Sequence, residues 1–269
     1  MLKQIEGTVN FIKDRITSDP EVGIILGTGL GGLVNEIDIN ETLSYDDIPD
    51  FPVSTVEGHH GRLIFGTLNG KSVVAMQGRF HYYEGYSAEK ITFPVRVMKF
   101  LGIKHLFVSN ASGGINPDFE IGDLMVINDH INLIPNPLIG KHEKGFGPRF
   151  PDMSNVYDPN LISTFKQIAK KHDIKLQEGV YTVVTGPTFE TPAEYKYFRI
   201  IGSDTVGMST VPEVIVAHQM GIPVFAVSII TDLGVPGKIM EVSHEEVQRV
   251  ASKAEKKMTL LIKEMMGKI

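Results

Sequence analysis

The fold is decided by the stretch Val22-Gly23-Ile24-Ile25-Leu26-Gly27-Thr28-Gly29-Leu30-Gly31-Gly32. Its first five residues form an apolar run typical of a strand buried on both faces of a sheet, and a glycine-rich turn follows at once. Glycine lets the backbone approach an anion closely, so the amides of this turn, assisted by the start of a following helix, favour a phosphate group.

Gly27, Gly29 and Gly32 also fit the pattern G-x-G-x-x-G of dinucleotide-binding folds. Such a fold needs a second strand that ends in an acidic residue about 20 positions later. Asp46 and Asp47 lie in a polar, proline-containing stretch that shows no β-like run. We therefore expect a phosphate turn, with a dinucleotide site or a tight turn without a ligand as the alternatives.

Buried strands and amphipathic helices alternate along the rest of the chain, which predicts an α/β fold. Further strands are expected at His105–Ser109, Val180–Val184, Thr205–Met208 and Val224–Ile230. Helices are expected at Ala88–Leu101, Pro159–Lys171, Pro192–Ile201, Val211–Met220 and Ser243–Ile269. The runs Leu63–Thr67 and Ser72–Gln77 flank an Asn-Gly turn and predict an antiparallel hairpin, so the sheet should be mixed.

The segment Asp129–Asn155 contains four prolines and no clear period, which predicts a long loop. A loop of this length in a compact domain is typically a lid or a contact surface.

Composition limits the classes of protein. The 269 residues are 42% hydrophobic and 22% charged, which is typical of a globular chain, and the absence of a linker favours one domain over residues 1–269. The 26 basic and 32 acidic residues give a net charge of −6 without a basic run, so we expect no nucleic-acid partner. Segment 1–15 lacks the apolar core of a signal peptide, and no stretch approaches the roughly 18 apolar residues of a membrane span, so a cytoplasmic protein without a membrane partner is expected. Zero cysteines exclude disulfides and thiolate chemistry.

Polar clusters follow several of these strands, at the edge where open α/β sheets hold ligands. In Gly78–Tyr86, Arg79 and His81 are placed to bind an oxyanion, and the nearby tyrosines offer a flat surface for a sugar or a base. A surface loop with packed aromatic side chains is the alternative.

The cluster Glu57–Arg62 contains the adjacent histidines His59 and His60. Neighbouring side chains on a strand point to opposite faces, and no carboxylate lies at ligand spacing, so a metal site is not expected. One of the histidines can serve as an additional anion donor.

Phe189 and Glu190 follow another strand and combine an aromatic face with a hydrogen-bond acceptor, which suits a heterocycle that bears ring N–H groups. The alternative is that Glu190 only complements the dipole of the next helix. Ser209 and Asp232 lie at two more strand ends, and His244 follows further along the chain; Ser209 could also be an ordinary helix cap.

Taken together, these segments resemble the trimeric class of the purine nucleoside phosphorylase family. The resemblance covers nearly the whole chain and depends on GTGLGGL, STVEGHHGRL, MQGRFHYYEGY, SNASGGINP, GPTFETPAEY, GMSTVPEV and SHEEV. It implies a single-domain α/β fold with a mixed, twisted and partly barrel-like sheet flanked by helices. It also implies reversible phosphorolysis of purine nucleosides in purine salvage, with no cofactor, inorganic phosphate as co-substrate and a homotrimeric enzyme.

The resemblance also implies roles for individual residues. Catalytic residues would be His81, Glu84, Glu190 and Asp232. Phosphate would be bound by Thr28, His59, Arg79, His81, the backbone of Ala111, and Ser209. The nucleoside would be bound by Tyr83, Phe150, Phe189, Glu190, Met208, Asp232 and His244, with Phe150 reaching the sugar site of a neighbouring subunit.

Asp232 departs from the family pattern, because most members that use 6-oxopurines have Asn at this position. An ionised Asp only accepts hydrogen bonds, whereas an amide also donates. Asp is found here in the related methylthioadenosine phosphorylases, which are the nearest alternative; an NAD-binding oxidoreductase is a more distant one. Glu190 suits the N1–H of a 6-oxopurine and His244 suits a 5′-hydroxyl, so we expect inosine and guanosine to be favoured.

Overall fold

The computed structural model describes residues 1–27, 31–53 and 60–269. Within these residues, nine strands form one mixed sheet in the order β2-β3-β4-β1-β5-β8-β7-β6-β9. The strands are β1 Val22–Leu26, β2 Asp38–Ser44, β3 Arg62–Leu68, β4 Lys71–Gln77, β5 His105–Gly114, β6 Leu124–Asn132, β7 Leu176–Val183, β8 Thr205–Gly207 and β9 Val224–Leu233. An additional pairing of β9 with β5 closes the ring β5-β8-β7-β6-β9, which confirms the predicted mixed and partly barrel-like sheet.

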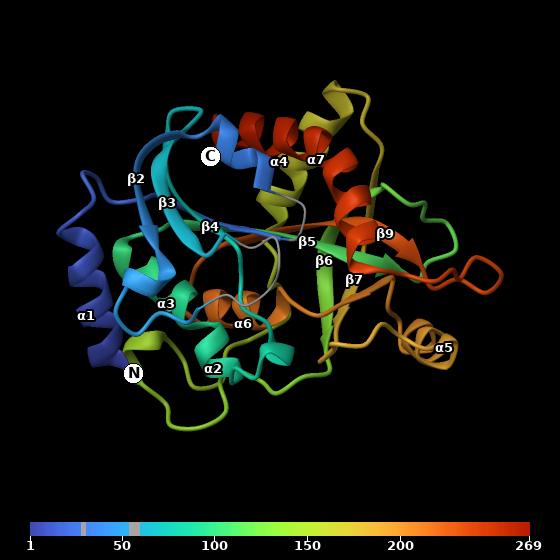
Figure 1. Ribbon diagram of the computed structural model, residues 1–269, viewed down its shortest axis with the longest axis horizontal. Coiled ribbons are helices and arrows are strands. Elements are labelled where there is room, and N and C mark those ends of the chain that lie inside the picture. The colour runs from blue at the N-terminus through green and yellow to red at the C-terminus, as the bar shows by residue number, and fades with distance from the viewer. Residues whose placement is uncertain (28–30, 54–59) are drawn as a thin grey trace.

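Helices cover both faces of this sheet. They are α1 Leu2–Lys13, α2 Ala88–Ile91, α3 Phe93–Leu101, α4 Pro159–Lys171, α5 Pro192–Ile200, α6 Val211–Gln219 and α7 His244–Met266. Helices α4 and α7 pack together on one side, whereas α1, α3 and α6 lie on the other (Figure 1). Two large clusters of buried apolar residues fill the two interfaces, so the single-domain α/β fold is confirmed.

The predicted hairpin of β3 and β4 is confirmed. Asn69 and Gly70 both have positive φ angles, of 47° and 84°, as a tight turn between antiparallel strands requires. All five residues of β1 are buried, and β1 pairs in parallel with both β4 and β5. Its carboxyl end therefore points to the same edge of the sheet as theirs.

Several predicted boundaries are wrong. The expected loop Asp129–Asn155 begins inside β6, which continues to Asn132. The helix expected at Ala88–Leu101 is divided at Thr92, because Pro94 at the start of α3 cannot donate a backbone hydrogen bond to the preceding turn. Strand β7 begins at Leu176, earlier than the apolar run suggests.

Strand β2 corrects the argument about dinucleotide binding, because Asp46 and Asp47 do follow a β-strand. This strand pairs antiparallel with β3 at the edge of the sheet. It is not the parallel neighbour of β1 that a dinucleotide fold requires, so the fold disfavours that alternative. In the described part of the chain, no helix is both long and apolar enough to cross a membrane.

Candidate active site

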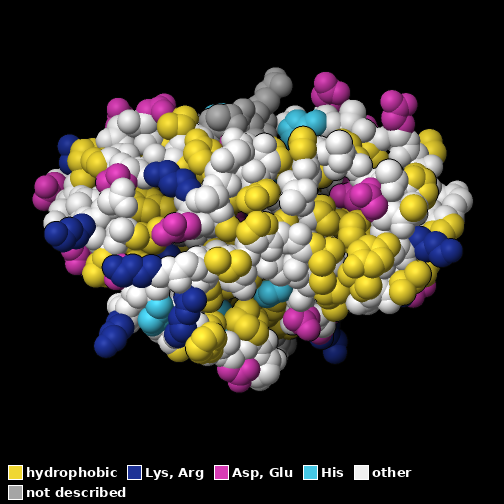
Figure 2. Space-filling view, turned by 90° about the horizontal axis from the view of Figure 1, so that it is seen from below, with side chains coloured by type: hydrophobic (Ala, Val, Ile, Leu, Met, Phe, Trp, Pro, Cys, Tyr) yellow, Lys and Arg dark blue, Asp and Glu magenta, His cyan; other side chains and the backbone are white. Residues whose placement is uncertain are grey.

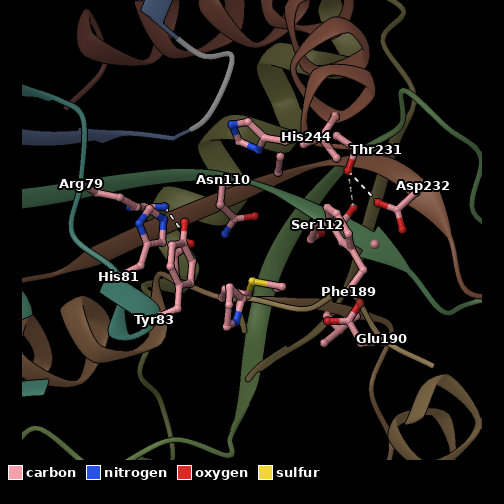
Figure 3. A pocket seen from close by; sticks show the side chains of 18 of the residues that line it. Arg79, His81, Tyr83, Asn110, Ser112, Phe189, Glu190, Thr231, Asp232 and His244 are labelled. Atoms are coloured by element: carbon pink, nitrogen blue, oxygen red, sulfur yellow. Dashed lines mark hydrogen bonds between the residues drawn. The ribbon is translucent and has the colours of Figure 1, made fainter. Parts of the chain in front are cut away.

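A cavity of about 470 Å³ opens where the predicted polar clusters meet. It lies beyond the ends of β4 and β7 and against the last residues of β5, β8 and β9, with the start of α7 above it (Figure 3). The lining includes these predicted site residues: Arg79, His81, Tyr83, Glu84, Ala111, Phe189, Glu190, Met208, Ser209, Asp232 and His244. Residues more than 160 positions apart in the chain therefore share one pocket, as the strand-end argument predicts.

Arg79 is the fixed cation of the cavity. Its side chain is buried, with 1% exposed, and its Nη1 donates to the carbonyl oxygen of Ser109 at 2.9 Å and to Ser209 Oγ at 3.0 Å. Its Nε lies 3.3 Å from Oε1 of the buried Glu213. A guanidinium keeps its charge at any physiological pH, so this end of the cavity presents a permanent, oriented cation.

A buried hydrogen-bond network supports Arg79 from behind. Thr210 Oγ1 lies 3.3 Å from Arg79 Nη1 and accepts a bond from Asn110 Nδ2 at 2.8 Å. Ser228 Oγ donates to Asn110 Oδ1 at 2.6 Å. Thr210 itself has a φ of 72°, a strained conformation for a residue with a branched side chain. The network holds that strained residue at the start of α6, next to Ser209.

His81 and Glu84 form a second fixed unit. Glu84 Oε1 accepts from the backbone N–H of His81 at 2.8 Å and lies 3.0 Å from His81 Nδ1. The His81 ring stacks on Tyr83, with 4.7 Å between ring centroids and 13° between planes. Burial lowers the pKa of His81, although Glu84 opposes the shift. These contacts fix the orientation of the imidazole beside Arg79 (Figure 3).

The opposite end of the cavity holds two carboxyl groups. Thr231 Oγ1 donates to Asp232 Oδ1 at 2.9 Å, and the Tyr195 hydroxyl donates to Asp232 Oδ2 at 3.4 Å. Burial raises the pKa of Asp232. Burial, together with the charge of Asp232, raises the pKa of Glu190 to about 7, so near neutral pH this end exchanges protons readily.

The cavity lining also includes aromatic and apolar side chains suited to a sugar or a planar ring. Phe189 is 41% exposed, and it lines the cavity together with Tyr83, Met208 and His244. Gly186, which precedes this segment, has a φ of 62°, and a Cβ atom there would lie 2.3 Å from Met208 Sδ. Glycine is therefore required where this loop passes Met208.

Comparison with known proteins shows the family. Residues 21–266 match the family described as the phosphorylase superfamily. The chain belongs to the phosphorylase superfamily.

Curated relatives of this superfamily cover almost the whole chain. Purine nucleoside phosphorylase 1 of Bacillus subtilis is 54% identical over 98% of this chain and 97% of its own length. The bovine (Bos taurus) purine nucleoside phosphorylase is 48% identical over 98% of this chain and 94% of its own length.

Solved structures agree with these relatives. Schistosoma mansoni purine nucleoside phosphorylase in complex with adenosine has a TM-score of 0.95 and 41% identity, and covers 99% of this chain and 97% of its own. Isoform 2 from the same organism, in complex with cytosine and ribose-1-phosphate, has the same TM-score and identity and covers 99% and 96%.

Three predicted residues are not placed in the cavity of this phosphorylase superfamily member. Thr28 and His59 lie outside the described residues. Phe150 lies outside the cavity lining and is 88% exposed. In the described part of the chain, no group of three His, Asp or Glu side chains could hold a metal ion.

Sequence reasoning missed two residues that organise this superfamily's site in our chain. Asn110 lies within the motif SNASGGINP, and the available signal was its place just after the apolar run that predicts a buried strand. Tyr195 gave no signal, because its partner Asp232 is 37 residues away in the sequence.

Proposed function

We propose that this chain catalyses the reversible phosphorolysis of purine ribonucleosides and deoxyribonucleosides, giving the free purine and the sugar 1-phosphate. The observation that carries the proposal is one cavity with the buried cation Arg79 at one end and the carboxyls of Glu190 and Asp232 at the other. An anion and a nucleobase bound at these two ends would place a sugar between them. The names of the relatives, and the adenosine and hypoxanthine in the solved relatives, support the same reaction.

The phosphate end would hold inorganic phosphate as co-substrate, so the reaction needs no protein nucleophile and no resident cofactor. Arg79, Ser209 and the backbone of Ala111 would donate to its oxygens, and the oriented His81 ring would contact it as well. Thr28 and His59 are proposed to complete this set. Holding phosphate next to the nucleoside makes the attack effectively unimolecular.

The base end would stabilise the leaving purine. As a phosphate oxygen bonds to C1′, the N9–C1′ bond breaks and its electron pair moves onto the purine. Ionised Glu190 would accept the N1–H of a 6-oxopurine, while a protonated Asp232 would give its proton to N7. Phe189 would stack on the base.

The sugar would lie against Tyr83 and Met208, with His244 reaching its 5′-hydroxyl. These contacts, together with Glu190, favour inosine and guanosine over methylthioadenosine, in which an apolar group replaces that hydroxyl.

The decisive experiment incubates the protein with inosine in the presence and absence of phosphate and measures hypoxanthine. We expect release that depends on phosphate. Hydrolysis without phosphate, or binding of inosine without turnover, would contradict the proposal. Parallel assays with adenosine and methylthioadenosine test the preference, and a strong preference for methylthioadenosine would reassign the substrate.

We also propose a homotrimer in which Phe150 closes the sugar site of a neighbouring subunit. Phe150 and Ile139 are highly exposed in a single chain, as is Ile200 on α5. Hydrophobic side chains gather on the half of the molecule where α5 lies (Figure 2). Large apolar patches on an isolated chain typically mark an interface. Analytical ultracentrifugation tests the trimer, and Phe150→Ala should raise KM several-fold while kcat changes little.

A further inference from the structure

Tyr195 lies behind the base end of the cavity and is rigidly held. Its side chain is 3% exposed and belongs to a small apolar cluster with Ile115, Phe198 and Val206. The ring packs directly over Gly234, where a Cβ atom would lie 2.2 Å from Tyr195 Cδ1. Tyr195 does not line the cavity, so contact with a bound substrate is not its role.

The hydroxyl of Tyr195 serves both carboxyl groups. It donates to Asp232 Oδ2 at 3.4 Å. It also lowers the pKa of Glu190, although burial, the largest influence, raises that pKa. A phenol has only one hydrogen to donate, so the two carboxylates compete for it. Burial and the two neighbouring acids raise the pKa of Tyr195, which keeps that hydrogen in place at physiological pH.

Few other titratable groups face this pair in the described structure. Glu194, in the first turn of α5, adds a weaker negative charge near Glu190. His244, at the start of α7, lines the same cavity. The arginine of the cavity lining, Arg79, lies at the other end (Figure 3). The donors that offset the two acids are the hydroxyl groups of Tyr195 and Thr231 and, for Glu190, a backbone N–H that lowers its pKa more than Tyr195 does.

We propose that Tyr195 is a positioning residue that couples Glu190 to Asp232 and so sets the pH range in which the site turns over 6-oxopurine nucleosides. This inference rests on the proposed function. The pair holds one proton. Because burial and the charge of Asp232 raise the pKa of Glu190 to about 7, that proton lies mainly on Glu190 before substrate binds. The productive state is the form in which the proton has moved to Asp232 and Glu190 is ionised to accept the N1–H. When Asp232 gives that proton to N7, the carboxylate left behind accepts from Tyr195 and Thr231, which stabilises it at the moment it forms.

Tyr195→Phe tests the coupling, because it removes the hydroxyl and keeps the ring over Gly234. Loss of this donor raises the pKa of both carboxyls, so both limbs of the pH profile of kcat/KM for inosine should move to higher pH by roughly half a unit. Tyr197→Phe is the matched control, since Tyr197 is 51% exposed on the same helix. A purely structural role of Tyr195 would lower the profile without moving its limbs.

Two further measurements keep the tests of the coupling and of the reaction separate. Gly234→Ala should displace the ring and move the limbs in the same direction, with thermal unfolding checked in parallel. Carbon-13 NMR titration of the Glu190 carboxyl needs no turnover and should show a higher pKa in Tyr195→Phe. A moved titration without phosphate-dependent hypoxanthine release would overturn the proposed function alone. If neither the limbs of the pH profile nor the titration of the Glu190 carboxyl moved, the role of Tyr195 would be overturned and the proposed function would stand.

Discussion

The two ends of the cavity are built in opposite ways. At the end proposed to bind phosphate, Arg79 and Glu213 are buried as an ion pair and supported by a buried hydrogen-bond network, so the charge there is fixed. At the end proposed to bind the base, Glu190 and Asp232 are only partly buried, their pKa values are raised, and their donors are neutral hydroxyl and backbone N–H groups. The difference follows from chemistry, because phosphate remains an anion throughout the reaction, whereas the purine gains negative charge and a proton.

The largest effect is expected from Arg79→Met. Loss of the cation should lower kcat/KM by on the order of 10³-fold. It should also lower the free energy of unfolding by about 3–5 kcal/mol, because Glu213 would be left buried without its partner. Phosphorolysis assays and urea unfolding measure the two effects.

The double variant Arg79→Met, Glu213→Gln separates stability from activity. It should recover most of the stability and none of the activity, since the buried charge is removed along with its partner. If Arg79→Met alone were as stable as the unaltered chain, the ion pair with Glu213 would not hold the charge of Arg79 in place.

The next largest effect concerns Glu190→Gln. Its amide can still accept the N1–H but carries no charge, so kcat/KM for inosine should fall roughly 10- to 100-fold. The free energy of unfolding at neutral pH should instead rise in Glu190→Gln. The pKa of Glu190 is about 7 in the folded chain and 4.5 in its ordinary state, so the folded state holds this proton more tightly. The resulting stabilisation is complete below pH 4.5 and is lost as the pH rises through 7.

Between pH 5 and 8, the unaltered chain should therefore lose about 2 kcal/mol of stability relative to Glu190→Gln, less than full burial would give because the group is partly exposed. Urea unfolding at the two pH values measures this difference. Glu120→Gln, at an exposed position outside the cavity, is the control and should show no such difference. If the unaltered chain and Glu190→Gln showed the same dependence of stability on pH, Glu190 would not change its protonation in this range.

The sequence predicts most of the residues that line both ends of the cavity, because the ends of strands can be recognised from local patterns. Buried apolar runs locate most of the strands around the cavity, and the clusters that follow them supply its lining. The strand β6 is harder to recognise, since four buried residues are followed by exposed or partly exposed ones as it leaves the core. Its polar half therefore resembles the start of the long loop.

The coupling within the base end could not be predicted, because it depends on packing between distant segments. Asp232 and Tyr195 meet where Gly234, just after β9, leaves room for the ring. In the sequence, Glu213 has the pattern of an ordinary acidic residue in the first turn of a helix. Its burial against Arg79 is seen only in the folded chain.

The smallest effect, and the one that most sharpens the comparison, is expected from Asp232→Asn. An amide donates to N7 at every pH, so the ratio of inosine to adenosine activity should rise about fivefold. The high-pH limb of the inosine profile should also flatten, because the proton donor no longer titrates. Assays of both substrates from about pH 5 to 9 measure this, with the exposed Asp118→Asn as control.

In the Asp232→Asn background, Tyr195→Phe should leave the high-pH side of the profile unchanged and still move the low-pH limb through Glu190. A high-pH limb that survives Asp232→Asn would place the titrating donor elsewhere, and an unchanged or lower ratio would remove Asp232 from the recognition of the base.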